Sequence, residues 1–177
     1  MAKKCILLLG GARSGKSHYA QKLAGELSKK VLFVATGEPL DEEMQVRIIQ
    51  HKKERPVNWQ TLETTINIGK QIEKQIDDAE VVIIDCLTLL ISNLLGDEPD
   101  YLKVEKQILA EINQTIACMD KLYVSFIIVS NEVGTGLVPE TKLGRTYRDL
   151  LGKANQLIAQ RADEVYFMVA GIPMKVK

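Results

Sequence analysis

The stretch Gly10-Gly11-Ala12-Arg13-Ser14-Gly15-Lys16-Ser17 follows the apolar run Cys5–Leu9 and opens a helical pattern over Lys16–Ser28. It fits the pattern G-x-x-x-x-G-K-[S/T], in which glycines let backbone N–H groups turn inward around a phosphate. The N-terminus of the following helix adds partial positive charge. The strand before and the helix after are the context that the pattern requires, so we favour a phosphate-binding loop over a glycine-rich turn that only starts a helix.

Two side chains of this loop have chemistry of their own. Lys16 carries a positive charge to the β- and γ-phosphate oxygens, and the Ser17 hydroxyl can bind Mg²⁺. We therefore predict that all of Gly10–Ser17 binds a purine nucleoside triphosphate, with Lys16 as a catalytic residue. The apolar run Val81–Asp85 ends in an acid that would be the second Mg²⁺ ligand, although such an acid can also simply cap the next segment.

Short β-branched apolar runs alternate with amphipathic stretches along the rest of the chain. The expected strands are Cys5–Leu9, Val31–Ala35, Trp59–Glu63, Val81–Asp85, Val124–Ser130, Val165–Ala170 and Pro173–Val176. The expected helices are Lys16–Ser28, Asp41–Glu54, Ile66–Ile76, Tyr101–Leu122 and Lys142–Ala162. This order predicts an α/β fold of the P-loop NTPase type, with three layers and a mostly parallel central sheet. Ligands of such sheets bind beyond the carboxyl ends of the strands, here after Leu9, Ala35, Asp85 and Ser130.

Composition narrows the class of protein. The 177 residues are 46% hydrophobic and contain 23 basic and 23 acidic side chains, which suits one globular domain over residues 1–177. The zero net charge argues against a nucleic-acid partner. No apolar run is long enough to span a membrane, no signal peptide is recognisable, and the three cysteines are widely spaced, so we expect a cytoplasmic protein with reduced thiols.

His51 lies in the predicted helix Asp41–Glu54, whose spacing places Arg47, His51 and Arg55 on one face. One interpretation is a solvated basic face of a surface helix. The other is a nucleophile, because neighbouring cations favour a neutral imidazole with a free lone pair and can also pair with phosphate oxygens. The spacing leaves both interpretations open.

Taken together, several blocks resemble the bifunctional adenosylcobinamide kinase/adenosylcobinamide-phosphate guanylyltransferases of cobalamin biosynthesis. They run nearly end to end: Gly10–Ser17, Val34–Met44, Arg47–Glu63, Asp85–Leu95, Asn131–Glu140, Arg148–Gln156 and Ala162–Lys177. The blocks H-[K/R]-x-x-R-P-x-x-W and N-E-V-G-x-G-x-V-P-E are far more specific than the phosphate loop. Tyr166 and Tyr147 depart from the Trp and Phe usual in the family, but both remain aromatic.

The resemblance implies two reactions. Adenosylcobinamide first takes the γ-phosphoryl group of ATP or GTP, and the product then takes GMP from GTP through a GMP–histidine intermediate. His51 matches the guanylylated histidine, so the resemblance implies that it is a second catalytic residue. Further nucleotide contacts implied by the family are Ala35, Thr36, Gly37, Lys52, Lys53, Glu54, Arg55, Glu63 and Asp85, besides Mg²⁺ bound by Ser17 and Asp85. The family also implies a homo-oligomer, expected to be a homotrimer.

Three rival functions remain to be compared. A monofunctional small-molecule kinase would use the phosphate loop and Asp85 but leave His51 idle. A regulatory GTPase needs N-K-x-D and D-x-x-G motifs, which Asn131–Gly134 and Asp85–Thr88 do not match. A nucleic-acid-stimulated ATPase conflicts with the zero net charge and the single Trp.

Overall fold

The computed structural model describes residues 3–38, 42–96 and 100–177, and the side chains of Glu43, Arg47 and Glu54 lie outside this description. Its strands are β1 (Cys5–Gly10), β2 (Val31–Ala35), β3 (Gln60–Glu63), β4 (Val81–Asp85), β5 (Ser125–Val129), β6 (Glu164–Val169) and β7 (Ile172–Lys175). They pair into one sheet in the order β3-β2-β4-β5-β1-β6-β7. Within this sheet β7 pairs antiparallel with β6 and the other pairings are parallel, which confirms the mostly parallel sheet.

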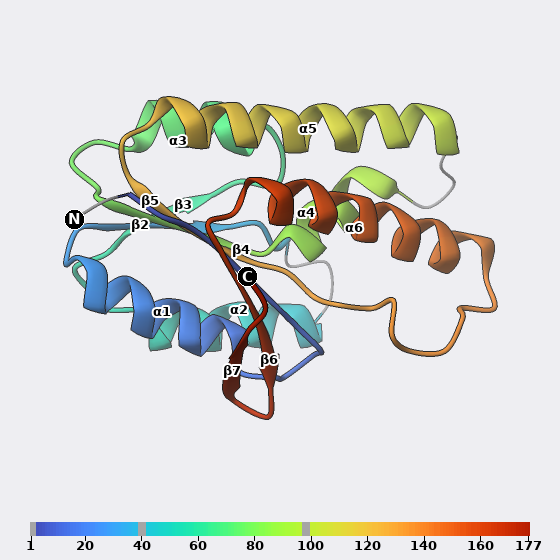
Figure 1. Ribbon diagram of the computed structural model, residues 1–177, viewed down its shortest axis with the longest axis horizontal. Helices are drawn as coiled ribbons and strands as arrows, with labels where there is room; N and C mark the ends of the chain where they lie inside the picture. The colour runs from blue at the N-terminus through green and yellow to red at the C-terminus, as the bar shows by residue number, and fades with distance from the viewer. Residues whose placement is uncertain (1–2, 39–41, 97–99) are drawn as a thin grey trace.

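Helices cover both faces of the sheet. They are α1 (Lys16–Leu27), α2 (Glu42–Glu54), α3 (Ile68–Gln75), α4 (Leu87–Leu95), α5 (Tyr101–Lys121) and α6 (Lys142–Arg161). Figure 1 shows α3, α4, α5 and α6 on one face and α1 and α2 on the other, so the chain has the three expected layers. Successive strand residues point to opposite faces, and accordingly Leu7 packs in the cluster under α3–α6 whereas Leu8 packs in the cluster under α1. Central strands therefore carry apolar side chains on both faces.

The expected elements are present with ends that differ by at most two residues, while the first residue expected in α2, Asp41, lies outside the described residues. The sequence pattern does not predict α4. Leu87, Leu90 and Ile91 are fully buried in it, because α4 packs against α5 and α6 and these three side chains join the core cluster that includes Ile84 of β4. A short helix that is apolar around most of its circumference shows no polar face, so its period cannot be read from hydrophobicity.

A buried carboxylate joins α5 to α3. Glu111, 8% exposed, accepts hydrogen bonds from the backbone N–H groups of Asn67 at 2.9 Å and Ile68 at 2.7 Å. Asn67 makes no side-chain cap at this helix end, so Glu111 satisfies donors that a helix N-terminus otherwise leaves unpaired. Glu111 and Ile68 are 43 residues apart in the sequence, so this long-range contact fixes α3 against α5.

Replacing Glu111 by alanine should lower the free energy of unfolding by about 1–3 kcal/mol, because two N–H groups at a buried helix end lose their acceptor. Glu111→Gln keeps an acceptor oxygen and should lose less. Urea denaturation measures both. Glu105→Ala, on the same helix, removes only a partly exposed pair with Lys153 and serves as the control. An equal loss in Glu111→Ala and Glu105→Ala would contradict the capping role.

Candidate functional site

A cavity of about 680 Å³ opens at the carboxyl edge of the sheet. It is bounded by the loops that follow β1, β2, β4 and β5, as expected for a parallel sheet, and by α2. The residues that line it are Ala12, Arg13, Ser14, Gly15, Lys16, Ser17, His18, Phe33, Ala35, Gly37, Met44, Ile48, His51, Lys52, Arg55, Glu63, Asp85, Cys86, Thr88, Leu89, Val129 and Asn131. Most residues predicted from the sequence thus meet in one place.

The phosphate loop holds the Lys16 side chain close to its own backbone. The Lys16 ammonium donates to the carbonyl oxygens of Gly10 at 3.1 Å and Gly11 at 2.6 Å, and to the Ser14 hydroxyl at 3.4 Å. Gly10 and Gly11 therefore orient Lys16 although they do not themselves line the cavity. Burial lowers the pKa of Lys16, and the nearby Asp85 and Cys86 act in the opposite direction. An anionic phosphate would add a partner for this buried charge.

The C-terminal hairpin supports the loop from the outer side. The Gly171 N–H donates to the Ser14 carbonyl at 3.0 Å, and a Cβ on Gly15 would approach the Gly171 Cα to 3.1 Å. Gly15 also has φ +90°, which favours glycine on conformational grounds. The close contact between loop and hairpin thus requires glycine at position 15.

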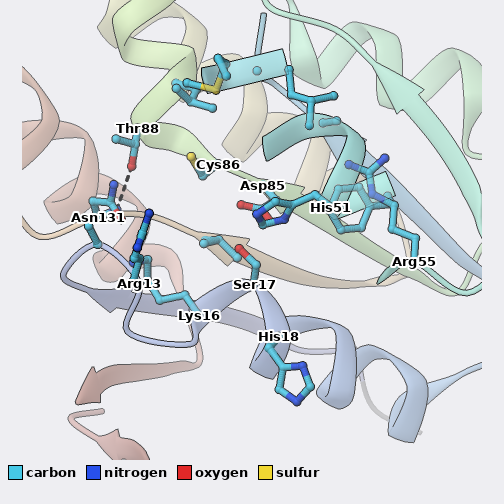
Figure 2. Close-up of a pocket in the computed structure, with 18 of the residues that line it drawn as sticks. Arg13, Lys16, Ser17, His18, His51, Arg55, Asp85, Cys86, Thr88 and Asn131 are labelled. Atoms are coloured by element: carbon cyan, nitrogen blue, oxygen red, sulfur yellow. Dashed lines mark hydrogen bonds between the residues drawn. The ribbon is translucent and has the colours of Figure 1, made fainter. Parts of the chain in front are cut away.

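Asp85 is the half-buried acid at the end of β4, and the Ser17 side chain lies next to it (Figure 2). Burial raises the pKa of Asp85, while Ser17, His51, Arg55 and Lys16 favour its charged form and act against that shift. Figure 2 shows Asp85 and Ser17 facing each other, with His51 directed toward Asp85. The two predicted Mg²⁺ ligands are therefore neighbours.

The α2 helix supplies His51, and the residue directly after its end supplies Arg55, to the cavity wall opposite the phosphate loop (Figure 2). The Arg55 guanidinium lies over the Phe33 ring, with 3.9 Å from Cζ to the ring centroid. Burial lowers the pKa of Arg55, opposed by the charges of Asp85 and Glu63, and its buried Nε has no hydrogen-bond partner among the described residues. A cation stacked on an aromatic ring and incompletely paired is well suited to an anionic ligand.

The remaining predicted contacts fall into two groups. Ala35, Gly37, Lys52 and Glu63 line the cavity, and Lys52 pairs with Glu63 at 2.5 Å on its exposed rim. Thr36 is fully buried, and its hydroxyl donates to the Cys86 carbonyl and accepts from the Cys86 N–H, so it fixes the turn after Asp85.

The last two predicted contacts are Lys53 and Glu54. Lys53 is exposed and is not among the described residues that line the cavity. The side chain of Glu54 lies outside the described residues.

Sequence reasoning missed several lining residues. Phe33 looks like any other apolar strand residue, and Thr88 follows Asp85 in the helix that the pattern did not predict. Asn131 had a signal, since it begins the loop after the strand expected to end at Ser130. Cys86 also lines the cavity, and burial raises the pKa of its thiol to about 11, so the thiol stays protonated near neutral pH.

A phosphate-loop motif, an acid beside its serine and a histidine on the facing wall are the arrangement expected of a P-loop nucleotide-dependent transferase. The profile of the family described as "Cobinamide kinase / cobinamide phosphate guanyltransferase" matches residues 6–176. The chain belongs to this family.

Individual relatives agree over nearly their whole length. The chain is 42% identical to the "Bifunctional adenosylcobalamin biosynthesis protein CobU" of Escherichia coli, over 97% of this chain and 99% of that protein. It is 39% identical to CobU of Salmonella typhimurium, with the same coverage. It is 41% identical to the "Bifunctional adenosylcobalamin biosynthesis protein CobP" of Pseudomonas aeruginosa, over 97% of this chain and 96% of that protein.

The fold has a more distant likeness as well. The crystal structure of the RadB recombinase superposes with a TM-score of 0.51 at 14% identity, over 93% of this chain and 73% of that one. At that identity the likeness concerns the fold alone, which is a mostly parallel sheet with helices on both faces. Among the described residues no helix has the length and apolar character needed to cross a bilayer.

Proposed function

We propose that the chain phosphorylates adenosylcobinamide with ATP or GTP and then transfers GMP from GTP to the product, giving adenosylcobinamide-GDP and pyrophosphate. The observation that carries the proposal is that one cavity contains both the Lys16 loop and His51. Family membership supports the same pair of activities. A kinase alone would need the loop but no histidine on the opposite wall.

The phosphorylation step needs positioning and charge neutralisation. The bond between the γ-phosphorus and the β–γ bridging oxygen breaks, and a bond forms from the acceptor hydroxyl oxygen to that phosphorus, while the hydroxyl proton is lost to solvent. Backbone N–H groups of Gly10–Ser17 hold the phosphates, and Lys16 neutralises charge on the β- and γ-oxygens. Arg13, at the edge of the cavity, faces the same region (Figure 2).

The guanylyl transfer step proceeds through a covalent intermediate on His51. An imidazole nitrogen attacks the α-phosphorus of GTP, the bond to the α–β bridging oxygen breaks, and pyrophosphate leaves. A phosphate oxygen of adenosylcobinamide phosphate then attacks the same phosphorus and releases the imidazole. Covalent catalysis divides a displacement between two large anions into two easier steps. Arg55 and Lys52 lie beside His51 to neutralise phosphate charge, and Ala35, Gly37 and Glu63 would contact the nucleotide.

The site fits Mg²⁺ bound together with a nucleotide. The described residues contain no cluster of three or more His, Cys, Asp and Glu side chains that would hold a metal ion alone. The Ser17 hydroxyl and the Asp85 carboxylate are oxygen donors next to each other, and Mg²⁺ in nucleotide sites commonly takes one or two protein ligands plus phosphate oxygens and water. When bound, Mg²⁺ would neutralise charge on the phosphates. Ser17 and Asp85 are the residues that would hold it.

Other features predicted from the sequence stay predictions. The homotrimer and the cytoplasmic location rest on the resemblance and on composition. Thr36, Lys53 and Glu54 remain predicted nucleotide contacts from that resemblance, although Thr36 would act through the backbone that it fixes.

Purified protein incubated with adenosylcobinamide, ATP, GTP and Mg²⁺ tests the proposal directly. Mass spectrometry should find adenosylcobinamide phosphate when ATP is the sole nucleotide and adenosylcobinamide-GDP when GTP is added. Intact mass of the protein after GTP and Mg²⁺ alone should show the gain of one GMP. If adenosylcobinamide phosphate formed but neither adenosylcobinamide-GDP nor the GMP adduct of the protein was found, the chain would be a monofunctional kinase.

Asp85→Asn should weaken the response to Mg²⁺ without weakening the fold. The variant keeps the shape of the side chain and loses the charge, so half-maximal activity should need on the order of tenfold more Mg²⁺, equivalent to about 1.4 kcal/mol. Since burial raises the pKa of Asp85, the folded state favours the protonated carboxyl, and the wild type loses stability as the pH rises through that pKa. The variant should therefore be at least as stable as the wild type at pH 7.

Mg²⁺ titrations of both activities and denaturation between acid and neutral pH measure these effects. The stability difference should shrink as the pH falls. Asp78→Asn, at an exposed and distant acid, controls for loss of charge. Unchanged metal titrations in Asp85→Asn would remove Asp85 from the metal site.

A further inference from the structure

The strand β5 runs between the phosphate-loop strand and the strand that ends in Asp85. It pairs in parallel with β1 on one side and β4 on the other, and Val129 is level with both Leu8 and Asp85. Beyond the end of β5 the chain still runs alongside β1, since the Glu132 N–H donates to the Gly10 carbonyl at 3.0 Å. Asn131 therefore lies beside the start of the phosphate loop, two residues beyond the level of Asp85.

The alternation of an extended chain directs the Asn131 side chain into the cavity. Val129 and Asn131 both line the cavity, whereas Ser130 between them points to α6 and donates to Asn155 at 2.6 Å. In Figure 2 Asn131 lies with Thr88 and Arg13 near Lys16, while His51 and Arg55 lie at the other side. Asn131 thus belongs to the phosphate-loop end of the cavity.

Two buried side chains fix the backbone of Asn131. Its N–H donates to the Thr88 hydroxyl at 2.8 Å, and its carbonyl accepts from the Asn155 amide at 3.0 Å. Thr88 and Asn155 are 8% and 6% exposed and come from α4 and α6. The Asn131 carboxamide itself forms no hydrogen bond with the rest of the described chain. A pinned backbone that presents an unpaired amide to a cavity is preorganised to bind a ligand.

We propose that the Asn131 amide donates a hydrogen bond to the γ-phosphoryl group of the bound triphosphate and so selects triphosphate over diphosphate. This inference rests on the proposed kinase activity and adds a residue to it. The contact would hold the phosphorus in line with the acceptor oxygen during transfer. A neutral amide can donate to a phosphate oxygen without repelling it, whereas a carboxylate at the same place would repel it.

Equilibrium binding of Mg·ADP and of a non-hydrolysable Mg·ATP analogue tests the contact. In Asn131→Ala the affinity for the ATP analogue should fall about tenfold, equivalent to about 1.4 kcal/mol, while the affinity for ADP stays within about twofold. In the isosteric Asn131→Asp variant the affinity for the ATP analogue should fall further, and the affinity for ADP should again change little. The kcat for phosphorylation should also fall more in Asn131→Asp than in Asn131→Ala. The KM for adenosylcobinamide should change little in both variants.

Asn113→Asp, on the exposed side of α5, makes the same charge change away from the cavity and should leave both affinities unchanged. Equal losses for ADP and the ATP analogue would assign Asn131 a structural role and overturn the proposal. Unchanged affinities, or a change in the KM for adenosylcobinamide alone, would overturn it as well. Failure of the wild type to bind either nucleotide would instead refute the proposed function.

Discussion

Replacing Lys16 by alanine should reduce both phosphorylation and guanylyl transfer by about 10²–10³-fold, the usual effect of losing one preorganised charge partner at a reacting phosphate. Both reactions use a triphosphate in the cavity that Lys16 lines, so both should decline. The fold should survive, because two effects of the change oppose each other. The variant loses the hydrogen bonds of Lys16 to Gly10 and Gly11, but it also removes a charge whose pKa is lowered by burial.

Steady-state kinetics of each half-reaction and circular dichroism measure these effects. Lys22→Ala, an exposed lysine later in α1, is the matched control and should keep wild-type rates. If phosphorylation by Lys16→Ala stayed within about twofold of the wild type, the phosphate-loop assignment would be wrong.

The phosphate loop and its surroundings could be predicted because they depend on local sequence. Glycines, a lysine and a following helix are contiguous in Gly10–Ser17, and the rule for parallel sheets then identifies the loops after Ala35, Asp85 and Ser130 as the other walls. The structure places a cavity at those loops. Knowing the strand ends was sufficient, without any long-range contact.

Other parts of the site depend on contacts that no local pattern records. His51 has two compatible interpretations from spacing, and only the packing of α2 places it on the cavity wall with Asp85. The two side chains that hold the Asn131 backbone are 43 and 24 residues away in sequence. Thr36 is the opposite case. Its position directly after a strand suggests a contact with the ligand, but its hydroxyl forms its hydrogen bonds with the Cys86 backbone instead.

The His51→Ala variant should lose guanylyl transfer to background while it keeps phosphorylation. Phosphorylation needs Lys16, a metal ion and an aligned hydroxyl, none of which His51 supplies, so its rate should stay within about tenfold, allowing about 1.4 kcal/mol for disturbed positioning. Transfer through a covalent intermediate has no other nucleophile at that place. His18, the second histidine, also lines the cavity, but it is exposed and lies on α1, apart from His51 in Figure 2.

The decisive measurement is radioactive label kept by denatured protein after incubation with α-labelled GTP and Mg²⁺. Wild type and His18→Ala should both retain label, and His51→Ala should retain none. The label should be lost in mild acid and survive alkali, because protonation of a phosphoramidate nitrogen makes imidazole a good leaving group. An ester on Ser or Thr lacks that sensitivity. Equal labelling of His51→Ala and wild type, or an acid-stable adduct, would mean that His51 only belongs to a basic helix face, and the cavity would then contain a kinase site alone.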